Sequence, residues 1–220
     1  MNDERDESAN TTACAISSGV PIRRAGVRAR RVFSSSSLEE ALETLGDVLS
    51  DREQSVELAV IGGGSLMLSK LLERATKDLD VVALVIAGEY RRAQPFPDFL
   101  AAAVQDVAAA LGLRLDWLNP GPTDLLQLGL PPGFEQRTTL RRFGGLRLHI
   151  AGRKDQICFK LYASVDQGPG SKHAADLKAL RATPDELRWA GDWCRSHDPS
   201  DGFAQQLALA LQVLGGGHGG

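Results

Sequence analysis

Asp78 and Asp80 are two carboxylates separated by a single residue, an arrangement that could bind a metal ion. They open an apolar, β-branched stretch that ends at Ile86, and such a stretch predicts a strand. Residues two apart on a strand point to the same face, so the carboxylates would lie roughly 6–7 Å apart and repel each other by about 2.5 kcal/mol. We expect Mg²⁺ or Mn²⁺ to relieve this repulsion. Two solvated acids at the start of a strand are the alternative.

A run of three glycines lies upstream, between a short apolar segment at 57–61 and Ser65. The apolar segment predicts a buried strand, and the residues after the glycines predict a helix over 66–74 with Ser65 as its N-cap. Glycine has no Cβ, so the backbone amides of Gly63 and Gly64 could approach a phosphate closely, with Ser65 beside them at the helix N-terminus. A structural turn between strand and helix is the alternative.

The rest of the sequence predicts the helices and strands that would hold the acid pair and the glycine turn in place. Apolar periodicity and turn residues predict helices and strands in alternation, so the fold class is α/β (α+β), with a small mixed β-sheet, packed helices and a helical C-terminal part. We expect helices over 38–49, 98–111, 153–165, 183–196 and 202–214, and strands over 113–118, 138–142 and 146–150. Along the chain we expect a disordered tail at 1–32, an α/β core at 33–152, the helical part at 153–214 and a flexible tail at 215–220.

Composition limits the class of protein. Hydrophobic residues make up 43% of the chain and charged residues 24%, which is typical of a globular protein. The three cysteines are far apart and form no metal-binding or disulfide pattern. No apolar run could span a membrane, and no signal peptide is visible. We therefore expect a cytoplasmic protein without a membrane partner. The net charge of −3 excludes a globally basic surface. A local basic cluster remains at Arg137, Arg141, Arg142, Arg147, Arg153 and Lys154, which could hold RNA.

A glycine–serine turn, a helix and then D-x-D on the next strand together resemble the DNA polymerase β-like nucleotidyltransferase superfamily. The variant G-G-G-S-L-M-L with R-A-T-K-D-L-D-V is most similar to the AbiEii-type nucleotidyltransferases, which are toxin halves of some bacterial toxin–antitoxin and phage-defence systems. The resemblance covers about 56–180. It implies metal-dependent transfer of a nucleotide from a nucleoside triphosphate to an acceptor hydroxyl, with RNA or tRNA as the acceptor suggested by the toxin members, and a cognate antitoxin protein as a partner.

The resemblance also implies roles for residues outside the two motifs. Asp116, on the strand expected at 113–118, would be the third carboxylate of the metal site. Its alternatives are the polar half of an alternating strand or an ion pair with Arg114. Lys160, in K-L-Y-A, matches a lysine that reaches the triphosphate. Lys172 and Asp176 match a downstream basic residue and catalytic aspartate, although an ion pair between these two is the alternative for Asp176.

The same sequence departs from the family pattern at one point and leaves other functions open. The family usually has an Arg-Asp pair where this chain has Lys172 and His173. A catalytically silent nucleotide-binding module, or an antitoxin-like module that binds a partner protein, is one alternative to an enzyme. An enzyme that transfers a nucleotide to a small molecule such as an antibiotic is another, and it would require an acidic pocket for a cationic acceptor.

Overall fold

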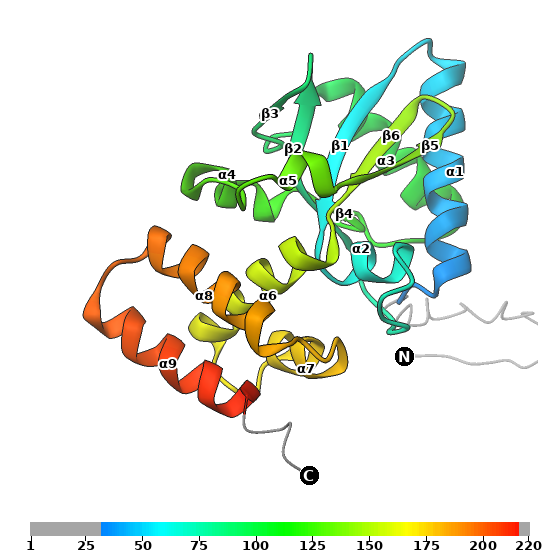
Figure 1. The fold of residues 1–220 in the computed structure, drawn as a ribbon. Helices are drawn as coiled ribbons and strands as arrows, with labels where there is room; N and C mark the ends of the chain where they lie inside the picture. The colour runs from blue at the N-terminus through cyan, green and yellow to red at the C-terminus, as the bar shows by residue number, and fades with distance from the viewer. Residues whose placement is uncertain (1–31, 216–220) are drawn as a thin grey trace, which may run out of the picture.

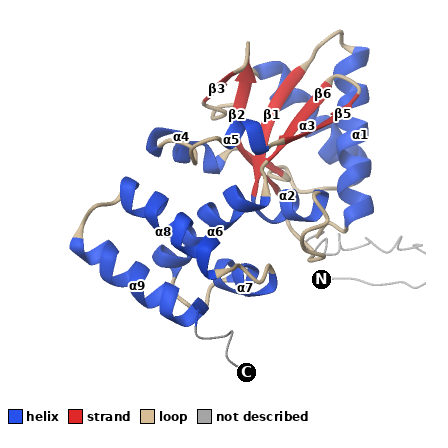
Figure 2. Cartoon of the chain, in the orientation of Figure 1, coloured by secondary structure: helices blue, strands red, loops and turns tan. Residues whose placement is uncertain are grey.

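The computed structural model describes residues 32–215, so most of the tail expected at 1–32 and the last five residues lie outside the described part. A mixed sheet lies at its centre, with strands in the order β3-β2-β1-β6-β5 and with β4 paired to β2 (Figures 1 and 2). The expected α/β fold with a small mixed sheet is therefore confirmed. The strands are β1 (Val56–Ile61), β2 (Leu79–Ile86), β3 (Glu89–Arg91), β4 (Leu118–Asn119), β5 (Thr139–Phe143) and β6 (Leu146–Ile150).

The strand register brings three chain segments together at one end of the sheet. β1 runs antiparallel to β2, so the end of β1 meets the start of β2, and Ile61 pairs with Asp80. β4 runs parallel to β2, and Asn119 pairs with Asp80 from the other side. This end of the sheet therefore carries the glycine turn that follows β1, the acid pair at the start of β2 and the end of β4.

Helices cover both faces of the sheet. Leu58 and Val60 of β1 pack in one apolar cluster with residues of α1 and α3, whereas Ala59 and Ile61 pack in a second cluster with residues of α6 and α8. This alternation is expected of a strand that is buried on both faces. The helices are α1 (Ser35–Asp51), α2 (Gly62–Leu68), α3 (Asp98–Leu111), α4 (Leu125–Leu128), α5 (Phe134–Arg137), α6 (Arg153–Gln167), α7 (Lys172–Ala179), α8 (Pro184–His197) and α9 (Asp201–Gly215).

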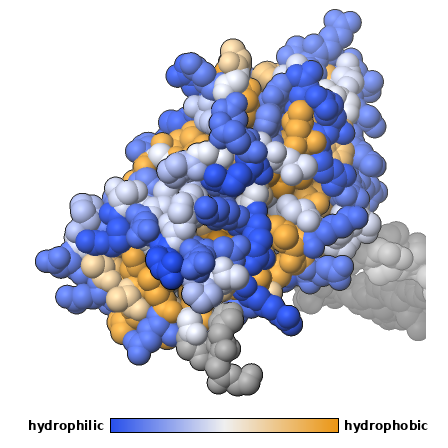
Figure 3. All heavy atoms as spheres, viewed as in Figure 1, coloured by the Kyte–Doolittle hydropathy of each residue, from blue (hydrophilic) through white to orange (hydrophobic). Residues whose placement is uncertain are grey.

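The C-terminal helices α6 to α9 form a group beside the sheet (Figure 1). In the same view, hydrophilic residues cover much of the surface, and apolar surface lies over this helical group (Figure 3). Leu209 and Val213, one turn apart on α9, are among the exposed apolar residues. Within residues 32–215, no helix is both long and apolar enough to cross a membrane.

Strong local signals predict several of the element boundaries accurately. The helix expected at 98–111 is α3, and Gly112 ends it in the left-handed conformation. The strands expected over 138–142 and 146–150 are confirmed as β5 and β6, which form a hairpin joined at Gly144 and Gly145. α8 begins at a capping box in which Thr183 accepts from the amide of Glu186 and the Glu186 carboxylate accepts from the amide of Thr183.

Two expected elements are wrong. The helix expected over 66–74 is α2, which already begins at the glycines and ends at Leu68, so Ser65 lies inside the helix and is not its N-cap. The strand expected over 113–118 is reduced to the two residues of β4, and Asp116 lies in a turn. β4 runs parallel to β2 and pairs with its first two residues, so residues 113–117 would have to pair with the segment before β2, which is not a strand.

The helix α1 contacts the β5–β6 hairpin backbone to backbone at Gly46. The amide of Gly145 donates to the carbonyl of Gly46 at 2.9 Å. A Cβ placed on Gly46 would lie 1.8 Å from the carbonyl oxygen of Phe143. A side chain of any size at this position would therefore force the helix away from the sheet.

We predict that Gly46→Ala destabilises the protein by about 1–3 kcal/mol, because the added methyl group overpacks a backbone contact. Helix propensity alone predicts the opposite sign, since alanine in a helix is favoured over glycine by roughly 0.5–1 kcal/mol. Gly191→Ala in α8 is the matched control, because its added Cβ would meet only Leu211 at 3.5 Å and should stabilise. Urea unfolding of both variants measures the difference, and stabilisation by both would contradict the close contact.

Candidate functional site

A pocket of about 260 Å³ lies at the end of the sheet where β1, β2 and β4 meet, and helices α6 and α7 close its other side. It contains both residues of the acid pair, two residues of the glycine turn and four basic or imidazole side chains. Its lining residues include Gly62, Gly63, Arg74, Thr76, Asp78, Asp80, Phe159, Lys160, Lys172 and His173. This volume lies near the lower limit of about 300 Å³ for small-molecule sites, so the pocket would enclose only part of a nucleotide.

The two carboxylates of D-x-D both face this pocket, as expected from their spacing on the strand. Burial, followed by the negative charge of Asp78, raises the pKa of Asp80 from its ordinary 3.8 to about 6, although a hydrogen bond from Asn119 and the charge of Lys160 act in the opposite direction. The side-chain amide of Asn119 donates to Asp80 Oδ1 at 2.9 Å and fixes its orientation. Thr76 donates to the carbonyl of Asp78 at 3.1 Å and holds the approach to the strand.

The first glycine of the turn is required by its backbone conformation and by the carboxylate beside it. Gly62 has φ of +79°, and a Cβ on it would lie 2.1 Å from Asp80 Oδ2. Gly63 also lines the pocket, but Gly64 and Ser65 do not. Gly64 instead packs against the start of β2, where an added Cβ would meet Leu79 at 2.9 Å. The sequence therefore located the turn, but only part of it faces the pocket.

Ser65 is fully buried and takes part in a hydrogen-bonded network that fixes the turn. Its hydroxyl donates to the carbonyl of Val60 at 3.2 Å and accepts from Nε2 of Gln156 at 2.7 Å. The other end of the Gln156 side chain accepts from the amide of Gly62 at 3.0 Å. Gln156 lies on α6, so this helix and the glycine turn are held in one register.

The pocket also has a basic wall, formed by its cations. Lys160 lies one turn after Gln156 on α6, is 3% exposed, and pairs with Asp176 at 2.7 Å. Asp176 is itself 2% exposed and also pairs with Arg74 at 3.1 Å. The expected alternative for Asp176, an ion pair with Lys172, is not what the described residues form. Two cations thus share one buried carboxylate, and Lys172 adds a third cation at the rim of the pocket.

His173, which follows Lys172 on α7, also lines the pocket. Burial, and then the charges of Lys160 and Lys172, lower the pKa of its imidazole from 6.5 to about 4, while Asp176 acts in the opposite direction. The imidazole is therefore neutral at pH 7. Its Nδ1 is buried and has no hydrogen-bond partner among the described residues.

Asp116 does not lie with the other predicted site residues. Its carboxylate accepts from Arg114 Nε at 2.7 Å, its side chain is 59% exposed, and it is outside the pocket lining. The ion pair with Arg114, one of the alternatives from the sequence, is therefore present. The residue that lies beside Asp80 on β4 is Asn119, and not Asp116, for which the resemblance implies the third carboxylate.

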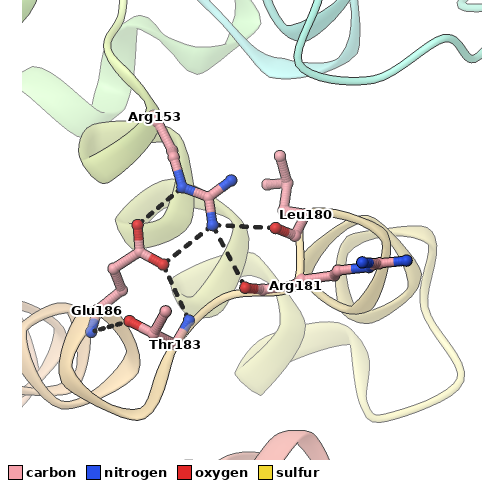
Figure 4. Close-up of polar contacts among 5 residues, drawn as sticks. All are labelled: Arg153, Leu180, Arg181, Thr183 and Glu186. Carbon is pink, nitrogen blue, oxygen red and sulfur yellow. Dashed lines mark hydrogen bonds and ion pairs between the residues drawn. The ribbon is translucent and has the colours of Figure 1, made fainter.

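The basic cluster around the hairpin is largely neutralised. Arg137 pairs with the fully buried Asp155, and Arg141 pairs with Glu39 at 2.7 Å. Arg153 donates to both carboxylate oxygens of Glu186 and to the carbonyls of Leu180 and Arg181 (Figure 4). Arg147 pairs with Glu57, and Lys154 stacks over Trp189 at 4.0 Å. All six basic residues lie outside the lining of the pocket, so the structure does not bring them to the acid pair.

Sequence reasoning missed several residues that build this pocket. Gln156 and Asn119 act through partners that are 94 and 39 positions away along the chain, so no local pattern marks them. Arg74 begins the motif R-A-T-K-D-L-D-V, but its partner Asp176 is 102 positions away, so the motif alone does not assign its role. Gln156 carried one weak signal, since it is a polar residue that precedes the apolar run of α6 and lies four residues before Lys160.

The pocket therefore combines an acidic wall and a basic wall around a glycine turn. Comparison with protein-family models matches residues 36–169 to a family described as nucleotidyltransferase of unknown function (DUF6036). No curated protein and no solved structure matched in the other two comparisons. The matched residues make up more than half of the sequence and include the glycine turn, the acid pair and Lys160. The chain therefore belongs to this family of nucleotidyltransferases.

Proposed function

We propose that this protein transfers a nucleoside monophosphate from a nucleoside triphosphate to an acceptor hydroxyl, with the triphosphate and its divalent ion bound in the pocket. The observation that carries this proposal is the division of the pocket into two charged walls. Asp78 and Asp80 line the pocket together with Arg74, Lys160 and Lys172, beside the glycine turn. A polyphosphate with a bound divalent ion has the charges that complement both walls.

The residues present fit Mg²⁺ or Mn²⁺ that arrives with the nucleotide. Magnesium is commonly bound through one or two carboxylates, with substrate phosphates and waters as its other ligands. Among residues 32–215 there is no group of three or more His, Cys, Asp or Glu side chains that could hold a metal ion alone. Asp78 and Asp80 would therefore be the protein ligands. When bound, the ion would neutralise charge on the phosphate oxygens during transfer.

The other pocket residues would bind and orient the substrate. Lys160 and Arg74 are preorganised by their ion pairs with Asp176, so they lose little side-chain freedom when they bind phosphate. Gly63 allows a phosphate to approach the backbone closely, because it has no side chain in the way. Phe159 contributes apolar surface to the same pocket, where the nucleoside could pack. Lys172 is exposed at the rim and would compensate the charge of the departing pyrophosphate.

The basic cluster does not identify the acceptor, because it lies outside the lining of the pocket. Four of the six basic residues suggested from the sequence pair with carboxylates, and none of the six lines the pocket. RNA as the acceptor, and a toxin activity with a cognate antitoxin, thus rest on the AbiEii resemblance alone.

A nucleotide-binding protein without transferase activity is the second candidate, and one observation favours it. The position beside Asp80 on β4 holds Asn119, whose side-chain amide donates a hydrogen bond and brings no negative charge. The superfamily resemblance implies a third carboxylate that assists the attacking hydroxyl. Binding of the metal–nucleotide complex without release of pyrophosphate would support this candidate over the enzyme.

We predict that Asp80→Asn stabilises the free protein but weakens nucleotide binding. The pKa of Asp80 in the folded protein lies above its ordinary value, so its ionised carboxylate destabilises the fold above about pH 6. Removing the charge should raise the free energy of unfolding at pH 8 by about 1–3 kcal/mol, and the gain should fade as the pH drops from 6 to 4. Denaturant titrations at pH 4.5 and pH 8 measure it.

The same variant should bind a non-hydrolysable Mg²⁺–nucleoside triphosphate at least about tenfold more weakly, because one of two protein carboxylates for the ion is lost. Asp192→Asn, an exposed acid on α8, is the control and should change neither quantity. Unchanged nucleotide affinity in Asp80→Asn by isothermal titration calorimetry would exclude Asp80 as a metal ligand.

We predict that Lys160→Met lowers both stability and nucleotide affinity. The substitution leaves the buried Asp176 with Arg74 as its only remaining ion-pair partner in the described chain. It also removes a cation from the pocket. Arg137→Met is the matched control, because it breaks the ion pair of another buried carboxylate, Asp155, away from the pocket.

Both variants should have a lower free energy of unfolding. The decrease is up to roughly 3–5 kcal/mol when a buried carboxylate loses its ion-pair partner. Only Lys160→Met should weaken binding of the triphosphate analogue, by about tenfold or more, because only this lysine lies in the pocket. Equal loss of affinity in the two variants would show that Lys160 acts through general stability and not through contact with the nucleotide.

A further inference from the structure

The imidazole of His173 is the polar group of the pocket wall that the proposed function does not yet use. It lines the pocket among the cations, next to Lys172 and near Lys160 and Arg74. It makes no hydrogen bond to any residue within 32–215, and its Nδ1 is enclosed by protein. A buried polar nitrogen without a partner is unusual in folded proteins and requires an explanation.

The enclosed Nδ1 determines which nitrogen of the ring carries the proton. A neutral imidazole has one N–H donor and one acceptor nitrogen. Placing the hydrogen on Nδ1 would bury a donor that has no acceptor, which costs more than leaving a lone pair unused. The hydrogen therefore resides on Nε2, the nitrogen that is not enclosed. Protonation of both nitrogens is opposed by the same enclosure and by the neighbouring cations.

We propose that His173 donates a hydrogen bond from Nε2 to the phosphate chain of the bound nucleotide, a contact that rests on the proposed function. The charged groups that act on the ring include Lys160, Lys172 and Arg74 but neither residue of the acid pair, so the group that the ring meets is the one that the cations attract. Phosphate oxygens accept hydrogen bonds and do not donate them, which matches an N–H donor. The charged groups around the ring are Lys160 of α6, Lys172 and Asp176 of α7, and Arg74 of the loop before β2. The sequence of α9, which packs on α7, has a single charged residue, Asp201, at its start.

A neutral donor has a role here that a fourth cation would not fill. Arg74, Lys160 and Lys172 already surround the pocket, and another positive charge would add repulsion in the free protein. An N–H donor adds a directional contact to phosphate without that repulsion. This gives a physical reason for a histidine at the point where the chain departs from the Arg-Asp pattern of the resembling family.

The test compares substitutions that keep or remove the donor, with binding measured by calorimetry. His173→Gln retains an N–H near the position of Nε2, whereas His173→Leu and His173→Ala remove it. The probes are inorganic triphosphate and a non-hydrolysable nucleoside triphosphate, each with Mg²⁺. His197→Leu is the matched control, because His197 also has a buried nitrogen without a described partner but lies outside the pocket.

We expect the Leu and Ala variants to bind both probes about tenfold more weakly, His173→Gln to bind within about threefold of the wild type, and His197→Leu to bind like the wild type. Thermal melts identify any variant that is not folded, and the Ala variant serves if the Leu variant is not. Equal weakening by Gln and Leu, or loss for the nucleotide but not for inorganic triphosphate, would overturn the phosphate contact while leaving the proposed function intact. Failure of the wild type to bind either probe would overturn both.

Discussion

The pocket depends on one buried ion-pair arrangement, in which Asp176 holds two cations from different parts of the chain. Asp176 comes from α7, Lys160 from α6 and Arg74 from the loop that precedes β2. A carboxylate that is 2% exposed requires compensating charge, since an unpaired buried charge costs several kcal/mol. The ion pairs of Asp176 therefore hold the helical part of the chain against the end of the sheet. One carboxylate for two cations also leaves excess positive charge, which an anionic ligand can compensate.

A second link between the same two parts is neutral and sets their register. The side chain of Gln156 uses both of its ends, accepting from Gly62 and donating to Ser65. Because Lys160 follows Gln156 by about one helical turn, the contact places the lysine beside the glycine turn. Asp80 lies against the other side of Gly62, where any Cβ would collide with it. The turn is therefore fixed between an acid on β2 and an amide on α6, and the close approach of the acid requires glycine.

Local chemistry explains which features could be predicted from the sequence. The face shared by Asp78 and Asp80 follows from the two-residue period of a strand, and the helix at α3 follows from its apolar period and a glycine end. The alternating pattern around Asp116 predicts a strand, whereas the length of the strand there depends on which residues pair with the edge of β2. Partners such as Gln156 and Gly62 are distant in the chain and meet only through packing, so no spacing rule identifies them.

In the proposed reaction, a nucleoside monophosphate is transferred through its α-phosphate while pyrophosphate leaves. The most direct measurement incubates the protein with Mg²⁺ and either α-labelled or γ-labelled nucleoside triphosphates, in the presence of separated RNA, protein and small-molecule fractions as acceptors. Nucleotidyl transfer predicts that the α-label becomes covalently attached to one fraction while the γ-label appears only in pyrophosphate, and that Asp78→Ala abolishes both. Attachment of the γ-label, or release of the γ-label as inorganic phosphate with no attachment of the α-label, would contradict it.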